Sequence, residues 1–278
     1  KIGELCQKFS GTVLLATPTF LRGFIRRCDP EYFETLDVVV TGAEKLPIDL
    51  AEAFEERFGT RPVEGYGATE TSPLVSVNVP PSRAADDTLG VREGSVGRPV
   101  PGVVVKVTDL DTDEELGAEE SGMLWVKGAN VMKGYYGNEE TTNEVLIDGW
   151  YRTGDVAKID KDGFIHITGR MSRFSKIGGE MVPHGTVEQA VAKALGVEDS
   201  ETPLVAIGSK ADPAKGESLV LLAVPEVDFD DLKKGLSEAG LANLWIPKEI
   251  KRVEEIPMLS TGKLDLKGIA RLAVGEEG

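Results

Sequence analysis

The chain has 278 residues, 41% of them hydrophobic, and its 47 acidic and 31 basic residues give a net charge of −16. So negative a chain argues against nucleic acid or anionic lipid as a general partner, because both bind cationic surfaces. Two cysteines and two histidines form no disulfide framework and argue against His-based metal or triad chemistry. Length and apolar content predict two folded domains, and no apolar run approaches a membrane span.

Residues 1–90 have the pattern of an α/β layer. Short apolar runs predict strands at 13–16, 38–41 and 61–64, and amphipathic stretches predict helices at 31–36 and 48–58. Pro47 stands where a helix can begin. Strands that alternate with helices favour parallel pairing.

The pattern changes twice further along the chain. Residues 91–170 predict strands at 103–108, 122–127 and 163–168 separated by turns, which is typical of a small antiparallel sheet or barrel. Residues 171–278 predict helices at 185–195, 230–239 and 266–273 and strands at 203–209 and 218–224. We therefore expect an α+β domain at the end of the chain, joined to the first domain at 170–173.

The densest motif is the run EGYGATETS at 64–72. Its glycines allow a ligand to approach the backbone, and the hydroxyls of Thr69, Thr71 and Ser72 are able to bond phosphate oxygens. Glu70 is a candidate Mg²⁺ ligand, since Mg²⁺ takes one or two carboxylates plus substrate phosphates. Tyr66 offers a flat face for a purine. An ordinary glycine-rich turn at a strand end explains the same spacing.

Three further motifs each end on a charged residue. Asp155 ends the run GWYRTGD, where a carboxylate at a tight turn is able to accept the two hydroxyls of a ribose, or simply to cap the turn. Arg170 ends GFIHITGR and suits a ribose or phosphate, or a surface ion pair. Lys263 ends PMLSTGK, which is not a P-loop because Pro257 stands in place of its first glycine.

Taken together and in this order, the motifs resemble those of the adenylate-forming (AMP-binding) superfamily of acyl and aryl ligases. The run GSVGRP at 94–99 adds to this resemblance. The runs VTGAEKL at 40–46, SVNVP at 76–80 and FSKIGGEMV at 174–182 are more narrowly similar to the synthetase half of the bifunctional 2-acylglycerophosphoethanolamine acyltransferase/acyl-ACP synthetase.

The resemblance implies an α/β fold in two parts. Residues 1–170 would be the C-terminal part of the large AMP-binding domain, with the α/β layer at about 1–90 and a small β subdomain at about 91–170. Residues 171–278 would be a mobile α+β lid. The implied reaction is activation of a fatty acid by ATP and Mg²⁺ to acyl-AMP, followed by transfer to the phosphopantetheine thiol of acyl carrier protein, linked to lysophospholipid reacylation. An acyl-CoA synthetase and a non-catalytic nucleotide- or acyl-binding fragment remain as alternatives.

The resemblance also implies roles for individual residues, which we carry over by motif. Gly42, Ala43 and Glu44 would lie beside adenine, with Tyr66 stacked on it and Gly67 in the same nucleotide site. Thr69 would contact the α-phosphate, Glu70 would bind the Mg²⁺, and Lys263 would bridge the carboxylate and the α-phosphate.

The remaining roles concern the ribose and the domain movement. Asp155 would bind the ribose with Arg170 nearby, Ser172 would be the hinge, and Gly178 and Gly179 would line the thiol tunnel.

The sequence departs from the family pattern at three places. The phosphate loop with its Pro-Lys would precede Lys1, so we expect an N-terminally truncated fragment that is inactive alone. The hinge position carries Ser172 instead of Asp or Lys, and Met181 replaces a common Arg, which favours the acyl-ACP synthetase type.

We expect a cytoplasmic protein without nucleic-acid partners. Any membrane contact, at the inner face, would come through regions outside this chain. An acidic carrier protein needs a basic docking patch, for which the candidates are Lys248, Lys251 and Arg252, or Arg22, Arg26 and Arg27.

Overall fold

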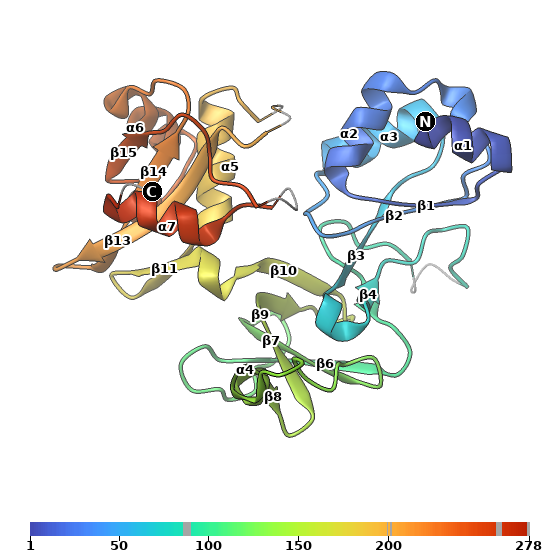
Figure 1. The fold of residues 1–278 in the computed structure, drawn as a ribbon, viewed down its shortest axis with the longest axis horizontal. Coiled ribbons are helices and arrows are strands. Elements are labelled where there is room, and N and C mark those ends of the chain that lie inside the picture. Colours follow the sequence, from blue (N-terminus) through green and yellow to red (C-terminus); the bar gives the residue numbers. More distant parts are fainter. Residues whose placement is uncertain (86–89, 199, 201, 260–262, 277–278) are drawn as a thin grey trace. The chain divides into compact units, whose positions relative to one another are not determined.

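The computed structural model describes residues 1–85, 90–198, 200, 202–259 and 263–276. The chain forms two compact units, Lys1–Thr168 and Gly169–Gly278 (Figure 1). The boundary lies two residues before the one expected from the sequence.

The first unit begins with a five-stranded sheet in the order β1-β2-β3-β4-β5. Its elements are α1 (Ile2–Phe9), β1 (Val13–Ala16), α2 (Pro18–Arg27), β2 (Val38–Thr41), α3 (Ile48–Phe58), β3 (Val63–Gly67), β4 (Leu74–Val77) and β5 (Arg98–Pro99). Strands β1, β2 and β3 are parallel, whereas β4 and β5 pair antiparallel. The parallel pairing expected from the alternation of strands and helices is therefore present.

Aromatic packing joins the helices to this sheet. Phe24, Phe33, Phe54 and Phe58 form one cluster, with ring centroids 4.7 Å apart for Phe54 and Phe58 and 5.0 Å for Phe33 and Phe58. The helix predicted at 31–36 is wrong. The 3₁₀ helix Pro30–Tyr32 is followed by a second turn, and Phe33 and Leu36 each bond the carbonyl three residues earlier. Two tight turns thus bury both side chains without an α-helix.

A second, antiparallel sheet completes the first unit, in the order β10-β9-β7-β6 with the short β8 beside β9. Its elements are β6 (Val103–Thr108), β7 (Ser121–Gly128), α4 (Glu139–Val145), β8 (Leu146–Ile147), β9 (Trp150–Ile159) and β10 (Ile165–Arg170). Strand β9 was missed in the sequence because its first half reads as a turn. The side chain of Tyr66 packs against buried residues of this second sheet.

The second unit is an α+β layer whose sheet has the order β12-β11-β14-β13, with β15 parallel to β14. Its elements are β11 (Phe174–Ile177), β12 (Glu180–Pro183), α5 (His184–Ala194), β13 (Val205–Asp212), β14 (Gly216–Ala223), α6 (Phe229–Glu238), β15 (Glu249–Arg252) and α7 (Leu266–Val274). Strand β14 is a continuous apolar run because both of its faces are buried. Leu219 and Leu221 pack in one core cluster, and Val220 and Leu222 pack in another that contains Ile269 of α7.

Across the described ranges, no helix is both long and apolar enough to cross a membrane.

Candidate functional site

Three segments of the first unit follow the carboxyl ends of parallel strands. Thr17 follows β1 and caps α2, whose first turn carries Thr19. The loop after β2 carries Gly42–Glu44, and the turn after β3 carries Thr69 and Glu70. Because β1, β2 and β3 are parallel neighbours, these segments share one edge of the sheet, where ligands bind in open α/β folds. The backbone N and the Oγ1 of Thr19 donate to Glu44 Oε2 at 3.2 and 2.8 Å, which ties the start of α2 to the loop after β2.

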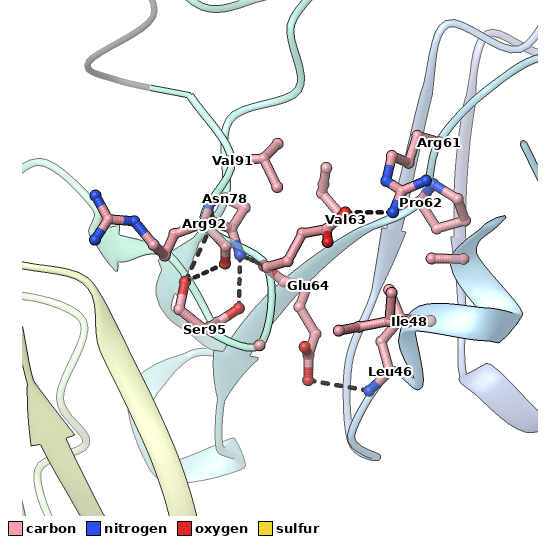
Figure 2. A pocket seen from close by; sticks show the side chains of 13 residues that line it. Leu46, Ile48, Arg61, Pro62, Val63, Glu64, Asn78, Val91, Arg92 and Ser95 are labelled. Carbon is pink, nitrogen blue, oxygen red and sulfur yellow. Dashed lines mark hydrogen bonds and ion pairs between the residues drawn. The ribbon is translucent and has the colours of Figure 1, made fainter.

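A buried carboxylate on β3 bonds the backbone of the loop after β2. Glu64 on β3 is 8% exposed, and its Oε1 accepts a hydrogen bond from the backbone N of Leu46 at 3.1 Å (Figure 2). Burial raises the pKa of Glu64, and the Leu46 N–H and the charge of Lys45 offset this only in part. Ala43 takes a left-handed backbone with φ 68°, so the loop is a constrained turn rather than a loose connection.

A small pocket that opens to solvent lies beside Glu64 and is shown in Figure 2. Its polar side chains bond to other groups of the protein. Asn78 Nδ2 donates to the carbonyl of Ser95 at 2.7 Å, Asn78 Oδ1 accepts from the backbone N of Arg92 at 2.9 Å, and Arg61 pairs with Glu55 and Glu93. None of the site residues predicted from the sequence is among the thirteen residues that line it. We therefore interpret this pocket as part of the support of the site.

The turn after β3 is built around Thr71. This side chain is fully buried, and its Oγ1 accepts from the backbone N of Ala68 at 3.0 Å. The prediction that the Thr71 hydroxyl binds phosphate is therefore wrong, because the turn itself uses that hydroxyl. Gly67 is required here, since an added Cβ would lie 1.7 Å from the carbonyl oxygen of Pro73. Thr69 is exposed and Glu70 is half-buried, so both remain accessible to a ligand.

A loop after β7 clamps the same turn and was not identified from the sequence. Asn130 Nδ2 donates to the carbonyls of Thr71 and Leu74 at 2.9 and 2.8 Å, and the backbone N of Met132 donates to the carbonyl of Glu70 at 2.7 Å. Tyr135 Oη donates to Glu70 Oε1 at 2.9 Å. The only sequence signal for this clamp is an aromatic pair in a polar loop, and that signal is weak.

Asp155 lies within strand β9, so its predicted place at the end of a tight turn is wrong. Gly154 has φ 75°, and the β7–β9 pairing shifts register between Met123 and Trp125, as expected for a β-bulge. Bulges re-aim side chains and are frequent beside active sites. Asp155 is 3% exposed and accepts a hydrogen bond from Tyr66 Oη, 89 residues away in the sequence. The structure thus brings together two residues that the sequence assigned to one nucleotide site.

The other predicted residues belong to the second unit. Arg170, at the end of β10, and Ser172, in the 3₁₀ helix Met171–Arg173, are exposed. Gly178 and Gly179 form the exposed turn between β11 and β12, with φ 60° and 91°, which glycine adopts without strain. Lys263 is exposed, and its carbonyl accepts from the backbone N of Leu259 at 2.7 Å. The remaining motif residues Ser260, Thr261 and Gly262 lie outside the described residues.

The donor set of the first unit fits a phosphate-borne Mg²⁺. The part of the chain that the structure describes contains no group of three or more His, Cys, Asp or Glu side chains arranged for a metal. Mg²⁺ keeps several waters and is usually held by one or two carboxylates plus phosphates, so a single half-buried Glu70 suits it. The described residues do not form a site in which protein side chains alone would coordinate a metal.

Comparisons with known proteins agree with this fold. Residues 2–136 match the family model of the AMP-binding enzyme family. The chain is 29% identical to the long-chain-fatty-acid–CoA ligase of Salmonella typhimurium over 92% of this chain and 44% of the ligase. It is 34% identical to the feruloyl-CoA synthase of Amycolatopsis sp over 87% of this chain and 47% of the synthase.

Solved structures extend the likeness to both units. The crystal structure of ATP-bound MatB from Rhodopseudomonas palustris matches with a TM-score of 0.79 and 26% identity, over 99% of this chain and 54% of MatB. The chain spans about half the length of the curated relatives it matches. The α/β fold and the match over residues 2–136 identify this part of the chain with the AMP-binding enzyme family of the adenylate-forming superfamily.

Proposed function

We propose that this chain supplies the nucleotide-binding and lid parts of an AMP-forming acid–thiol ligase of the acyl-CoA synthetase type. A carboxylate would attack the α-phosphorus of ATP and release pyrophosphate, and a thiol would then displace AMP from the acyl carbon. The observation that carries the proposal is the shared strand edge, with loops 42–44 and 67–70 at the ends of β2 and β3. The hydrogen-bonded pair of Tyr66 and Asp155 belongs to the same unit.

The nucleotide would be bound by residues of the first unit. Gly42, Ala43 and Glu44 lie in an exposed turn that offers backbone groups to adenine. The bond from Tyr66 to Asp155 limits rotation of the ring proposed to stack on the base, and Asp155 is proposed to accept the ribose hydroxyls.

The reacting groups would be held by charge. Thr69 would bond the α-phosphate, and Glu70 would hold Mg²⁺, which when bound neutralises phosphoryl charge. From the second unit, Lys263 would stabilise the negative charge that develops at the α-phosphate, and Arg170 would assist at the ribose. Ser172 is the proposed hinge, and Gly178 and Gly179 the proposed border of the thiol tunnel. No histidine is needed, because adenylation depends mainly on positioning and charge neutralisation.

We infer that CoA is the thiol acceptor. The relatives described above are a fatty acid–CoA ligase and a feruloyl-CoA synthase. A carrier protein would need a basic patch, and one of the two candidate patches is partly neutralised: Arg252 pairs with Glu226, and Lys251 Nζ lies 3.7 Å from Glu249 Oε1. Both relatives act on carboxylic acids with an apolar body, so we propose that class of acid as substrate. The acyl-ACP synthetase reading is the alternative for the acceptor.

The test is thioester formation by the complete natural polypeptide that contains this chain. A panel of fatty and aryl acids is incubated with ATP, Mg²⁺ and either CoA or a carrier protein, and the thioester is measured by mass spectrometry. We expect acyl-CoA in the wild type and a large loss in Lys263→Ala, with Lys267→Ala as the matched exposed control.

Thioester on the carrier but not on CoA would contradict the acceptor assignment and favour the acyl-ACP alternative. Absence of thioester and of acyl-AMP with every acid would instead favour a non-catalytic binding module.

A further inference from the structure

We propose that Tyr135, supported by Tyr151, is a positioning residue that fixes the carboxylate of Glu70 for a divalent cation. The inference rests on the proposed function, because it takes Glu70 as the carboxylate that holds the metal. Neither tyrosine was assigned a role from the sequence motifs.

The phenol of Tyr135 bonds the carboxylate directly, with Tyr135 Oη donating to Glu70 Oε1 at 2.9 Å. Tyr151, 5% exposed on β9, interacts with the Tyr135 hydroxyl from the buried side. Burial raises the pKa of both phenols, so Tyr135 keeps the proton that it needs as a donor to Glu70.

The backbone around Tyr135 is also fixed. The backbone N of Tyr135 donates to Thr142 Oγ1 at 2.9 Å, and that hydroxyl donates to the carbonyl of Asn138 at 2.7 Å. The same loop bonds the main chain of Glu70 through Met132. Both the backbone and the side chain of Glu70 are therefore held by one loop.

A phenol is the right kind of partner for this task. It orients a carboxylate without adding a positive charge, whereas Lys or Arg would compete with the cation for the same oxygens. In the described part of the chain only Oε1 of Glu70 accepts a hydrogen bond, so Oε2 remains as the oxygen for a cation. Partners that orient metal ligands commonly change metal affinity by about 10- to 100-fold when removed.

The experiment measures Mn²⁺ binding rather than turnover. Mn²⁺ stands in for Mg²⁺ and is titrated into the complete natural polypeptide with saturating α,β-methylene-ATP, with free Mn²⁺ followed by electron paramagnetic resonance. Tyr135→Phe is compared with Tyr151→Phe, with Glu70→Gln, and with Tyr136→Phe, whose ring is fully exposed beside Tyr135. Circular dichroism and metal-free nucleotide affinity are recorded for each variant.

We expect Tyr135→Phe to weaken Mn²⁺ binding about tenfold. Tyr151→Phe should weaken it less, and Tyr136→Phe should match the wild type, with metal-free nucleotide affinity unchanged in all three. If Glu70→Gln loses Mn²⁺ while both Tyr135→Phe and Tyr151→Phe retain wild-type affinity, the positioning role is overturned. If Glu70→Gln itself binds Mn²⁺ like the wild type, the metal role of Glu70 fails, and that part of the proposed function fails with it.

Discussion

Asp155 is a buried carboxylate that is proposed to bind the ribose of the nucleotide. Asp155 is 3% exposed, and the hydrogen bond from Tyr66 fixes the orientation of the carboxylate that is proposed to accept two hydroxyl groups. Hydrogen bonds to charged groups contribute about 1.5–3 kcal/mol each. The proposed ribose contact therefore accounts for a sizeable share of nucleotide affinity.

We expect Asp155→Asn to weaken AMP binding at least tenfold, because an amide accepts at one oxygen only and carries no charge. Isothermal titration calorimetry with AMP measures the change. Asp148→Asn, at an exposed position before β9, is the matched control. Equal AMP affinity in Asp155→Asn and the wild type would remove Asp155 from the nucleotide site.

Glu64 gives a prediction with a definite pH dependence. Burial raises the pKa of Glu64 above its unfolded value of about 4.3, so the folded state binds this proton more tightly than the unfolded state. The free energy of unfolding therefore falls as pH rises through the folded pKa, and the penalty persists at neutral pH.

We expect Glu64→Gln to raise the free energy of unfolding at pH 7 and to have little effect at pH 4, since glutamine still accepts from the Leu46 N–H. Urea titrations at both pH values test this, with the exposed Glu52→Gln as control. If Glu64→Gln is less stable than the wild type at pH 7 and equally stable at pH 4, the predicted direction of the effect is wrong.

Single residues were predictable where local sequence dictates the backbone. Gly67 belongs to that class only in part: the glycine-rich segment indicates the close approach of a ligand, whereas the group that the structure places beside Gly67 is the carbonyl of Pro73. The role of Thr71 and the clamp by Tyr135 were not predictable. Both depend on contacts with residues that the local sequence does not reveal, Tyr135 lying 65 positions from Glu70.

At the scale of elements, α7 is tied to the loop that carries Lys263. Asp265 caps this helix by accepting from the backbone N of Lys267 and of Gly268 at 3.1 Å each. The backbone N of Asp265 donates to the carbonyl of Pro257 at 2.9 Å, which closes the loop at its base. The cap thus fixes both the start of the helix and the exit of the loop.

We expect Asp265→Ala to lower the free energy of unfolding by about 1 kcal/mol, and Asp265→Asn to retain most of that stability. Chemical denaturation measures both variants. Asp228→Ala removes the equivalent cap of α6 and is a control, since it leaves the lysine loop untouched. If Asp265→Ala is as stable as the wild type, the cap is not what holds this helix start.

Helices and strands were predictable where one hydrophobic period runs through the whole element. Strand β14 and helix α3 have uninterrupted apolar or amphipathic patterns, and both lie close to where the sequence places them. Strand β9 breaks this rule because Gly154 interrupts it with a bulge, and that same interruption aims Asp155. The sequence pattern therefore failed to predict β9 at the bulge that orients a residue of the proposed site.

At the scale of the whole molecule, each unit buries its own core. Leu236 of α6 and Phe54 of α3 are both fully buried, in separate clusters of the second and first units. Cores that lie in separate compact units predict two unfolding transitions.

We expect calorimetry of the chain to show two transitions. Leu236→Ala and Phe54→Ala should each shift one transition only, because each lowers the free energy of unfolding of its own unit by about 2–5 kcal/mol. Residues 169–278 expressed alone should reproduce the transition that Leu236→Ala affects. One transition that shifts in both variants would show that the units fold as a single cooperative body.

The central claim is that the parent protein forms an acyl adenylate. Acid-dependent exchange of labelled pyrophosphate into ATP isolates this half-reaction from thiol transfer, and we would run it on the complete natural polypeptide with a panel of carboxylic acids. The account predicts exchange that requires an acid and Mg²⁺, falls strongly in Lys263→Ala and in Asp155→Asn, and is unchanged in Lys267→Ala. Absence of exchange with every acid, in a protein that still binds AMP, would contradict it.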